Sequence, residues 1–162
     1  MKIEIKNIKI NTAFSEETIC FKADVYVNGV KTAYASNDGH GGCTFYNAYE
    51  NKRELLREAE AYVKSLPNKI TLEYMIDDII DEVFNKKERA KFEKKIQKAT
   101  ETAVVYGVPN SGSFQSIGFK GKLKFADLMK TPQGRDAISR LVNRIKGELK
   151  KGEVILNTNI PF

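Results

Sequence analysis

The sequence predicts an α+β protein in which a mainly antiparallel sheet, made of an N-terminal hairpin and later strands, packs against about four helices. Three observations lead to this prediction. Residues 19–27 alternate between apolar and polar side chains, which is the period of a half-buried strand. Several longer stretches repeat their apolar residues every three or four positions, as helices do. Strand-like and helix-like segments are also grouped along the chain, which favours α+β over a doubly wound parallel sheet.

The N-terminal strands have the clearest pattern. Residues 1–10 predict a strand with a bulge or a break near Asn7, because the parity of the isoleucines changes there. After the alternating segment comes Asn28-Gly29, the favoured pair for a two-residue type I′ turn, in which both positions need a positive φ. A return strand over 30–36 completes the hairpin. The predicted register pairs Val27 with Val30, Val25 with Thr32, Ala23 with Tyr34 and Phe21 with Ser36.

The middle of the chain predicts three helices. The first is expected to begin near Asn47 or Asn51 and to end before Pro67, and the other two are expected at about 71–84 and 86–98. Asn47 or Asn51, each followed three positions later by Glu, is expected to cap the first, and Asn85 the third. The side chains change from acidic to basic near Asn85, but this switch is too weak to indicate two domains. We therefore expect one domain over 1–162.

The C-terminal third predicts two more strands, a helix and a last short strand. The expected order is a strand at 103–106, a hairpin loop at 107–115, a strand at 116–125, a helix from Thr131-Pro132 to about Lys150, and a strand at 154–156.

Composition limits the function classes. The 162 residues are 41% hydrophobic and 30% charged, as in globular proteins. The net charge of +6 favours anionic partners. No apolar run approaches the roughly 18 residues of a membrane helix, and no secretory signal is visible. We therefore expect a cytoplasmic location, no membrane partner, and free thiols at Cys20 and Cys43. The oligomeric state stays open.

The most informative segment for function is the glycine-rich loop 37–43. Glycines let a backbone approach a ligand closely, and consecutive N–H groups in such a loop bind phosphate or carboxylate. Two interpretations stay open: a connection whose glycines only satisfy turn geometry, or a site for an anionic ligand or a partner. No phosphate-loop signature is present. The candidate ligand-binding residues are Asn37, Asp38, Gly39, His40, Gly41, Gly42 and Cys43.

The second candidate surface is the expected basic helix 86–98. Lysines on a helix attract phosphates in a salt-dependent way that does not read base sequence. The alternative is a solvated helix face without a partner. Aromatic residues are scattered along the sequence, so no platform for stacking bases is predicted. The candidate nucleic-acid-binding residues are Lys87, Arg89, Lys91, Lys94, Lys95 and Lys98.

Catalytic and metal chemistry has weaker support. His40 is the single histidine, so an enzyme with an imidazole base would have to use it. A nucleophilic Cys43 beside it, or zinc held by Asp38, His40, Cys43 and Cys20, has suitable atom types. Neither has the spacing of known sites. We therefore assign no catalytic residue, no metal and no cofactor, and leave open whether the protein is an enzyme.

The block SNDGHGGCTFYNAY (36–49), behind the hairpin FKADVYVNGVKTAY (21–34), resembles small uncharacterised proteins carried by bacteriophages and prophages. The resemblance covers about the first third of the chain. It implies a viral or mobile-element accessory protein in the host cytoplasm. Such proteins act by binding: they block a host defence enzyme, sequester a nucleotide signal or contact nucleic acid.

Three hypotheses for function follow. The leading one is a non-enzymatic phage accessory protein that binds a host factor or an anionic ligand, with an anti-defence role, through loop 37–43 and nearby basic residues. The first alternative is a nucleic-acid-binding protein that uses the basic helix 86–98. The second is a small hydrolytic or metal-dependent enzyme centred on Asp38, His40 and Cys43.

Overall fold

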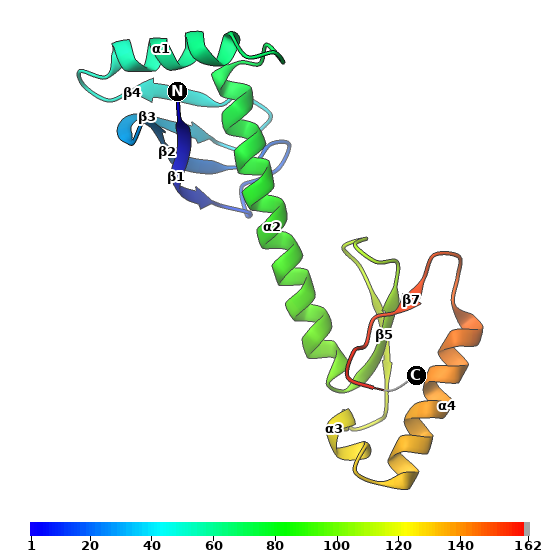
Figure 1. Ribbon diagram of the computed structural model, residues 1–162. Helices are drawn as coiled ribbons and strands as arrows, with labels where there is room; N and C mark the ends of the chain where they lie inside the picture. The colour runs from blue at the N-terminus through cyan, green and yellow to red at the C-terminus, as the bar shows by residue number, and fades with distance from the viewer. Residues whose placement is uncertain (161–162) are drawn as a thin grey trace. The chain divides into compact units, whose positions relative to one another are not determined.

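The computed structural model describes residues 1–160, and the chain divides into two compact units, Met1–Lys86 and Lys87–Phe162 (Figure 1). The division falls beside Asn85, where the sequence changes from acidic to basic. The single domain expected from the sequence stays a prediction. Each unit has its own hydrophobic core and its own antiparallel sheet, so the predicted α+β class is confirmed, with two sheets.

The first unit contains a four-stranded antiparallel sheet in the order β1-β2-β3-β4. Its strands are β1 (Ile3–Ile10), β2 (Phe21–Val27), β3 (Val30–Asn37) and β4 (Phe45–Ala48). The predicted turn is confirmed, because Asn28 has a φ of 51° and Gly29 a φ of 81°. The irregularity predicted near Asn7 is also confirmed: Asn7 has a φ of 54°, and the register of β1 on β2 shifts between Lys6 and Lys9.

The register of the hairpin differs from the prediction beyond the turn. Val27 pairs with Val30 as expected, but Val25 pairs with Ala33 instead of Thr32. The cause is a bulge at Thr32. This residue is buried, its hydroxyl donates to the carbonyl of Val30 at 2.9 Å, and its own carbonyl accepts the N–H of Tyr49 at 2.9 Å. One extra residue on β3 therefore moves every later pair by one position, so that Ala23 and Phe21 pair with Ala35 and Asn37.

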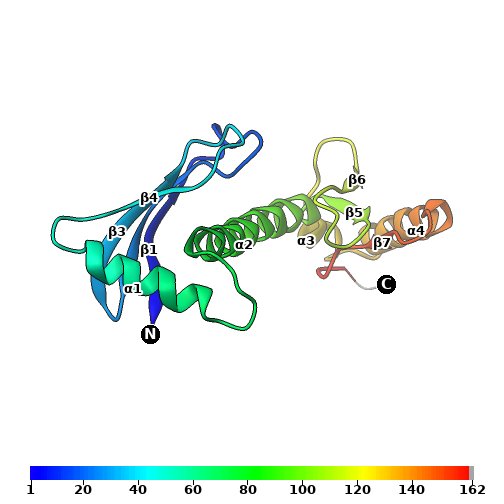
Figure 2. The ribbon, with the colours of Figure 1, turned by 90° about the horizontal axis from the view of Figure 1, so that it is seen from above.

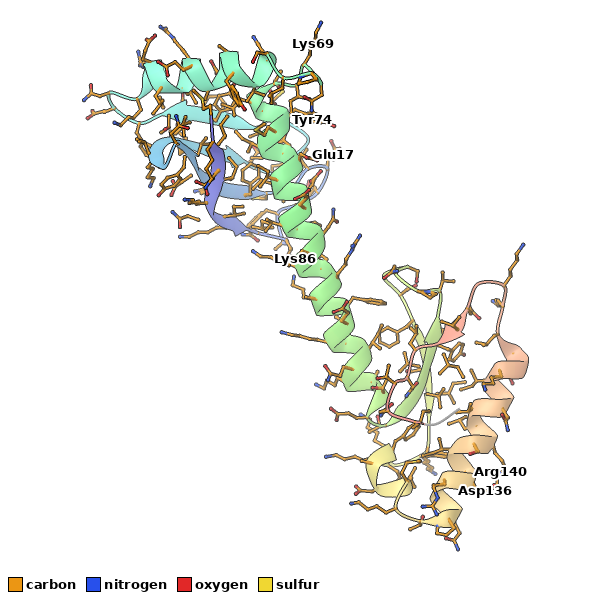
Figure 3. The ribbon with its side chains drawn as sticks, viewed as in Figure 1. Glu17, Lys69, Tyr74, Lys86, Asp136 and Arg140 are labelled. Carbon is orange, nitrogen blue, oxygen red and sulfur yellow. The ribbon has the colours of Figure 1, made fainter. Side chains whose placement is uncertain are left out.

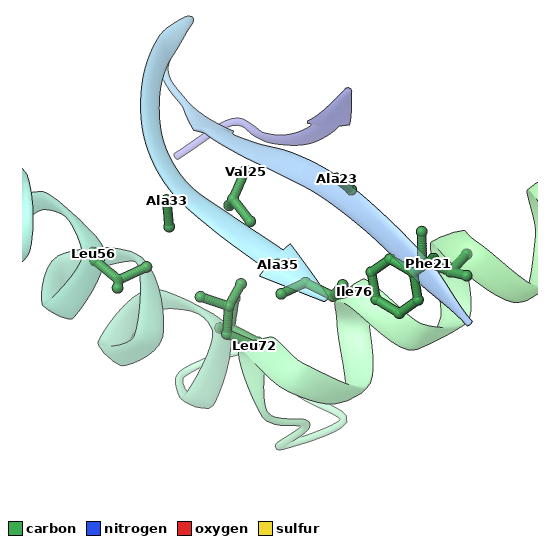
Figure 4. Packing of buried hydrophobic residues seen from close by; sticks show 10 residues of the cluster. Phe21, Ala23, Val25, Ala33, Ala35, Leu56, Leu72 and Ile76 are labelled. Atoms are coloured by element: carbon green, nitrogen blue, oxygen red, sulfur yellow. The ribbon is translucent and has the colours of Figure 1, made fainter. Parts of the chain in front are cut away.

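Two helices cover one face of this sheet (Figure 2). Helix α1 (Arg53–Lys64) and the first half of helix α2 (Leu72–Thr100) pack on the apolar side chains of β2 and β3. Figure 4 shows Leu56 and Leu72 facing Val25 on the sheet. The caps predicted for α1 are wrong, because Lys52 occupies the N-cap position without a side-chain hydrogen bond and Asn51 has a φ of 59° in the preceding turn.

The predicted break at Asn85 is also wrong. Helix α2 runs through it as one helix of 29 residues. Asparagine caps a helix only where the backbone leaves helical dihedrals, and neither Gly nor Pro stands near this position to force such a change. The acidic helix and the basic helix of the prediction are therefore two halves of α2.

The second unit contains a three-stranded antiparallel sheet in the order β6-β5-β7 with two further helices. Its elements after α2 are β5 (Ala103–Gly107), β6 (Gln115–Gly118), α3 (Phe125–Leu128), α4 (Pro132–Glu148) and β7 (Val154–Ile155). The hairpin loop predicted between 107 and 115 is confirmed, and so is the cap of α4, where Thr131 Oγ1 accepts the N–H of Gly134 at 3.1 Å.

The strand predicted over 116–125 ends at Gly118. A turn follows, with positive φ at Gly121 (87°) and Lys122 (52°). Leu123 is exposed and Phe125 is buried at the start of α3. Lys120, Lys122 and Lys124, which alternate in the sequence, therefore lie in this turn and at the start of α3 instead of on one strand face.

Candidate functional site

Loop 37–43 is held by hydrogen bonds from the first unit's own residues. Asn37, the first residue of the loop, is buried. Its Oδ1 accepts the hydroxyl of Thr18 at 2.7 Å and the N–H of Gly39 at 2.8 Å, and its Nδ2 donates to the carbonyl of Gly42 at 2.9 Å. The side chain of Asn37 therefore fastens both ends of the loop and ties it to the segment before β2.

The first two glycines of the loop serve this packing. Gly39 has a φ of 94°, and a Cβ there would overlap the carbonyl oxygen of Phe14. Its own carbonyl accepts the N–H groups of Glu16, Glu17 and Thr18 at 3.0, 3.1 and 3.3 Å. Gly41 has a φ of 89°, and a Cβ there would overlap the Glu17 carboxylate. The close approach that glycine permits is thus made to the chain itself at Gly39 and Gly41.

The remaining loop side chains, those of Asp38, His40 and Cys43, are exposed and do not form a catalytic arrangement with one another. His40 Nδ1 lies 3.1 Å from Glu16 Oε2, and the N–H of His40 donates to Asp38 Oδ1 at 3.3 Å. Cys43 carries an exposed free thiol. Across residues 1–160, no three His, Cys, Asp or Glu side chains gather as a metal site would require. The ligand-binding role of Asn37–Cys43 stays a prediction.

A recess of about 450 Å³ lies beside the loop. Asn37 and Gly42 line it together with four carboxylates, those of Glu16, Glu17, Asp77 and Asp81. Burial raises the pKa of Asp77, the hydroxyl of Thr44 lowers it by donating to the carboxylate, and the negative charges of Glu73 and Asp81 raise it further. Because the walls carry negative charge, this recess disfavours the anionic ligand expected from the sequence.

The positive charge of the chain lies in the second unit. Residues 87–162 contain 16 basic and 7 acidic side chains, a net charge of +9. Residues 1–86 contain 11 basic and 14 acidic side chains, a net charge of −3. The overall charge of +6 is therefore the sum of an acidic unit and a strongly basic one. An anionic polymer is attracted to the basic unit.

Within the basic unit, the predicted nucleic-acid-binding residues all lie on the second half of α2 and are all exposed. Four of them are spaced by four, three and four residues, which places them along one face of the helix: Lys87, Lys91, Lys94 and Lys98. We call these four residues the lysine stripe. Lys95 borders the stripe, whereas Arg89 lies about half a turn away from it on the same half-helix.

The opposite face of this half-helix packs on its own unit. Phe92 and Ile96 are half-buried, and the Phe92 ring lies 5.7 Å from the ring of Phe114. The lysine stripe is about half a turn away from this contact and extends along about 16 Å of helix axis. The structure thus brings the predicted lysines into one continuous row that faces away from the core.

Most of these lysines have no acidic partner. Lys91 pairs with Glu88 at 2.6 Å. In the part of the chain that the structure describes, Lys87, Lys94 and Lys98 make no ion pair. The arginines of α4 differ, since Arg140 pairs with Asp136 at 3.0 Å one turn away (Figure 3). The stripe therefore retains charges that are free to bind phosphate.

The sequence did not predict one surface of interest. It is the face of the first unit's sheet that lies opposite α1 and α2. The residues whose side chains alternate outward on β2 and β3 include Lys22, Tyr26, Lys31 and Tyr34. Lysine or tyrosine occupies four of the six outward positions, and Asp24 and Ser36 occupy the other two. This alternation was present in the sequence. The surface could not be assembled from the sequence, because the bulge at Thr32 changes which β3 side chains lie on this face.

No helix among residues 1–160 has the length and apolar character needed to cross a membrane. Comparison of the chain with protein-family models, with curated proteins and with solved structures found no match. The resemblance to phage and prophage accessory proteins therefore stays a prediction, and the case for function depends on the geometry and charge of these surfaces.

Proposed function

We propose that this protein binds nucleic acid through the lysine stripe on α2. The single observation that supports this most is the row of exposed lysines at 87, 91, 94 and 98, of which only one has an acidic partner in the described part of the chain. Such a row neutralises phosphates and releases counterions, which is the main source of sequence-independent affinity for nucleic acid.

The charge of the surrounding unit supports the same proposal. A net charge of +9 on 76 residues steers polyanions toward the second unit at long range. A solvated surface helix usually carries charges of both signs, often paired one turn apart. The second half of α2 instead has seven basic residues against Glu88 and Glu93.

The proposal is compatible with the phage accessory role implied by the resemblance, since contact with nucleic acid is one of the ways in which such proteins act. The alternative site at loop 37–43 has less support for an anionic ligand, because carboxylates line the recess beside it. A host protein as the partner of that loop stays a prediction.

The test is the salt dependence of binding to a labelled DNA duplex, measured by fluorescence anisotropy from about 50 to 200 mM salt. The variant Lys87→Gln/Lys94→Gln/Lys98→Gln removes three charges of the stripe. If each lysine neutralises one phosphate, the slope of log K against log salt becomes shallower by about 2 to 3. The matched control, Lys120→Gln/Lys150→Gln/Lys151→Gln, removes three exposed charges from the same unit outside the stripe.

The outcome separates a stripe from a general charge effect. The proposal requires that the stripe variant loses clearly more affinity than the control variant at each salt concentration. Equal losses in the two variants would assign the binding to net charge alone. Absence of binding at about 50 mM salt in the unchanged protein would reject a nucleic-acid function of the stripe.

A further inference from the structure

The outer face of the first unit's sheet carries exposed lysines and aromatic residues that have no role in the proposed function. In the first unit, α1 and the first half of α2 cover the inner face, and no helix or strand of that unit covers the outer one (Figure 2). We infer that this outer face is a binding platform for single-stranded nucleic acid. None of its residues belongs to the lysine stripe.

One row of residues across the four strands combines basic and aromatic side chains. Strand pairing places Lys9 opposite Lys22, Lys22 opposite Ser36, and Ser36 opposite Phe45. Phe45 is 65% exposed. An apolar ring so open to water on the flat face of a sheet is available for a base to stack on.

The neighbouring row provides a second ring. Here Lys6 is opposite Asp24, Asp24 opposite Tyr34, and Tyr34 opposite Asn47. The Tyr34 ring is 40% exposed, and its hydroxyl accepts a hydrogen bond from Asn47 Nδ2 at 3.2 Å. Tyr34 and Phe45 are diagonal neighbours on the paired strands β3 and β4, a separation of about 7–8 Å between backbone positions. Two successive bases can therefore meet two rings.

The second row contains one carboxylate, that of Asp24, and its charge is paired. Asp24 accepts hydrogen bonds from Asn7 at 2.7 Å and Tyr49 at 2.8 Å and pairs with Lys31 at 3.1 Å. Burial opposes ionisation, but these three contacts outweigh it and lower the pKa of Asp24. Lys31 also lies 4.8 Å from the centre of the Tyr49 ring. The charge of Asp24 is thus matched within the face and does not repel a phosphate as a free carboxylate would.

Two other lysines keep their charge available. In the part of the chain that the structure describes, Lys9 and Lys22 have no ion pair. Both line a recess of about 430 Å³, which Tyr34, Ser36 and the paired Asp24 also line. A recess with two ammonium groups and an exposed tyrosine ring fits one nucleotide, with the phosphate at the lysines and the base on the ring.

A second recess supports a path longer than one nucleotide. It measures about 640 Å³ and lies at the β4 edge of the face, where Tyr34 and Asn47 line it together with Arg53, Arg57 and Glu60 of α1. Each recess that Tyr34 borders is therefore lined by two basic side chains and one carboxylate. The double helix has its bases stacked inside, whereas a single strand can lay its bases on exposed rings, so this face favours the single strand.

The experiment measures binding of the full chain to a labelled oligothymidylate and a labelled oligouridylate of about 12 nucleotides, beside a DNA duplex of equal length. The two single strands distinguish DNA from RNA as the source of the ligand. The variant Phe45→Ala removes one exposed ring. The matched control is Tyr74→Ala, which removes a 62% exposed ring from α2 in the same unit.

The platform predicts that Phe45→Ala weakens binding of at least one single strand by about tenfold, leaves duplex binding unchanged, and exceeds the effect of Tyr74→Ala. A second variant, Lys9→Gln/Lys22→Gln, is expected to weaken single-strand binding more than Lys64→Gln/Lys69→Gln, which removes two exposed lysines of the same unit from outside the sheet. This second pair keeps the test valid if Phe45→Ala does not fold.

The outcomes separate the two surfaces. If the unchanged protein binds neither single strand at about 50 mM salt, or if both platform variants bind as their controls do, the platform is rejected. Loss of duplex and single-strand binding only in the lysine-stripe variant rejects the platform and supports the stripe. Loss of single-strand binding in the platform variants beyond the loss in their matched controls supports the platform, whatever the stripe variant does.

Discussion

The Oδ1 atom of Asn37 accepts the backbone N–H of Gly39 at 2.8 Å, so the residue that begins the glycine loop also holds its first glycine in place. Gly39 in turn accepts three N–H groups from the segment before β2 through its carbonyl. This arrangement makes the loop a structural joint between two segments that lie more than 20 residues apart in sequence. The first prediction follows from it.

Gly39→Ala is expected to destabilise the first unit by about 2–4 kcal/mol, because the new Cβ would overlap the Phe14 carbonyl and the backbone has a φ of 94°. Gly42→Ala is the matched control, since no atom lies within 4 Å of a Cβ at that position. Urea unfolding followed by circular dichroism measures both. Equal stability of the two variants would show that the loop is not packed as described.

Two glycines of α4 are expected to respond in opposite directions to alanine. Gly134→Ala should destabilise the second unit by about 1–3 kcal/mol, because its Cβ would overlap the backbone of Leu128. Gly147→Ala should stabilise it by up to about 1 kcal/mol, because that position is exposed within the helix and nothing lies near its Cβ. Thermal unfolding of both variants checks the prediction, and a change of the same sign in both would contradict it.

The ionisation of Asp77 is expected to reduce stability at neutral pH. Burial raises its pKa above the ordinary 3.8, so the folded state binds a proton more readily than the unfolded state does. The stability therefore falls as the pH rises from the unfolded pKa to the raised folded pKa, and the full cost is present above that range.

Asp77→Asn should accordingly raise the midpoint of thermal unfolding at pH 7, and the gain should shrink as the pH falls below the unfolded pKa. The amide oxygen can still accept the hydroxyl of Thr44. Asp78→Asn, at the exposed neighbouring position, controls for the change in net charge. A gain at pH 7 that persists unchanged at low pH would mean that ionisation is not its cause.

Asn157 is expected to be essential to the second unit. Its Oδ1 accepts the N–H of Val105 at 2.6 Å, and its Nδ2 donates to the carbonyl of Ala103 at 3.0 Å, both in buried surroundings. Asn157→Ala leaves these backbone groups without partners and should cost about 2–3 kcal/mol. Asn143→Ala, on the exposed face of α4, should change stability little. Hydrogen exchange at the Val105 amide gives an independent readout, which should become faster only in the Asn157 variant.

Local patterns in the sequence predicted much of the fold. The alternation before Asn28 identified β2, the Asn-Gly pair identified the turn, and Thr131-Pro132 identified the start of α4. These predictions succeeded because each depends on a few consecutive residues and on backbone preferences that act within one turn.

Other features depended on distant contacts. The bulge at Thr32 is supported by the hydrogen bond from the Tyr49 N–H, 17 positions later, and no local pattern announces it. Asn85 has the type of a cap residue, yet helix α2 continues through it. A residue's preference for ending a helix contributes little free energy, and the surrounding helix can override it.

Of the candidate sites, one could be predicted from local sequence patterns and the other depended on distant contacts. The lysine stripe could be read from the sequence, because residues at intervals of three and four lie on one face of any helix, whatever the rest of the chain does. The packing of Gly39 and Gly41 on the segment before β2 could not be predicted from the sequence. Glycine permits a close approach to a ligand and to the protein's own backbone equally.

By itself, the sequence determined the α+β class, the N-terminal hairpin, and the row of lysines along the second half of α2, since each follows from the period of a strand or a helix. The tertiary structure alone decided that loop 37–43 packs on its own chain and that Tyr34 and Phe45 share the outer face of a sheet. Both depend on which strands pair and in which register, and register is decided by contacts between residues far apart in the chain.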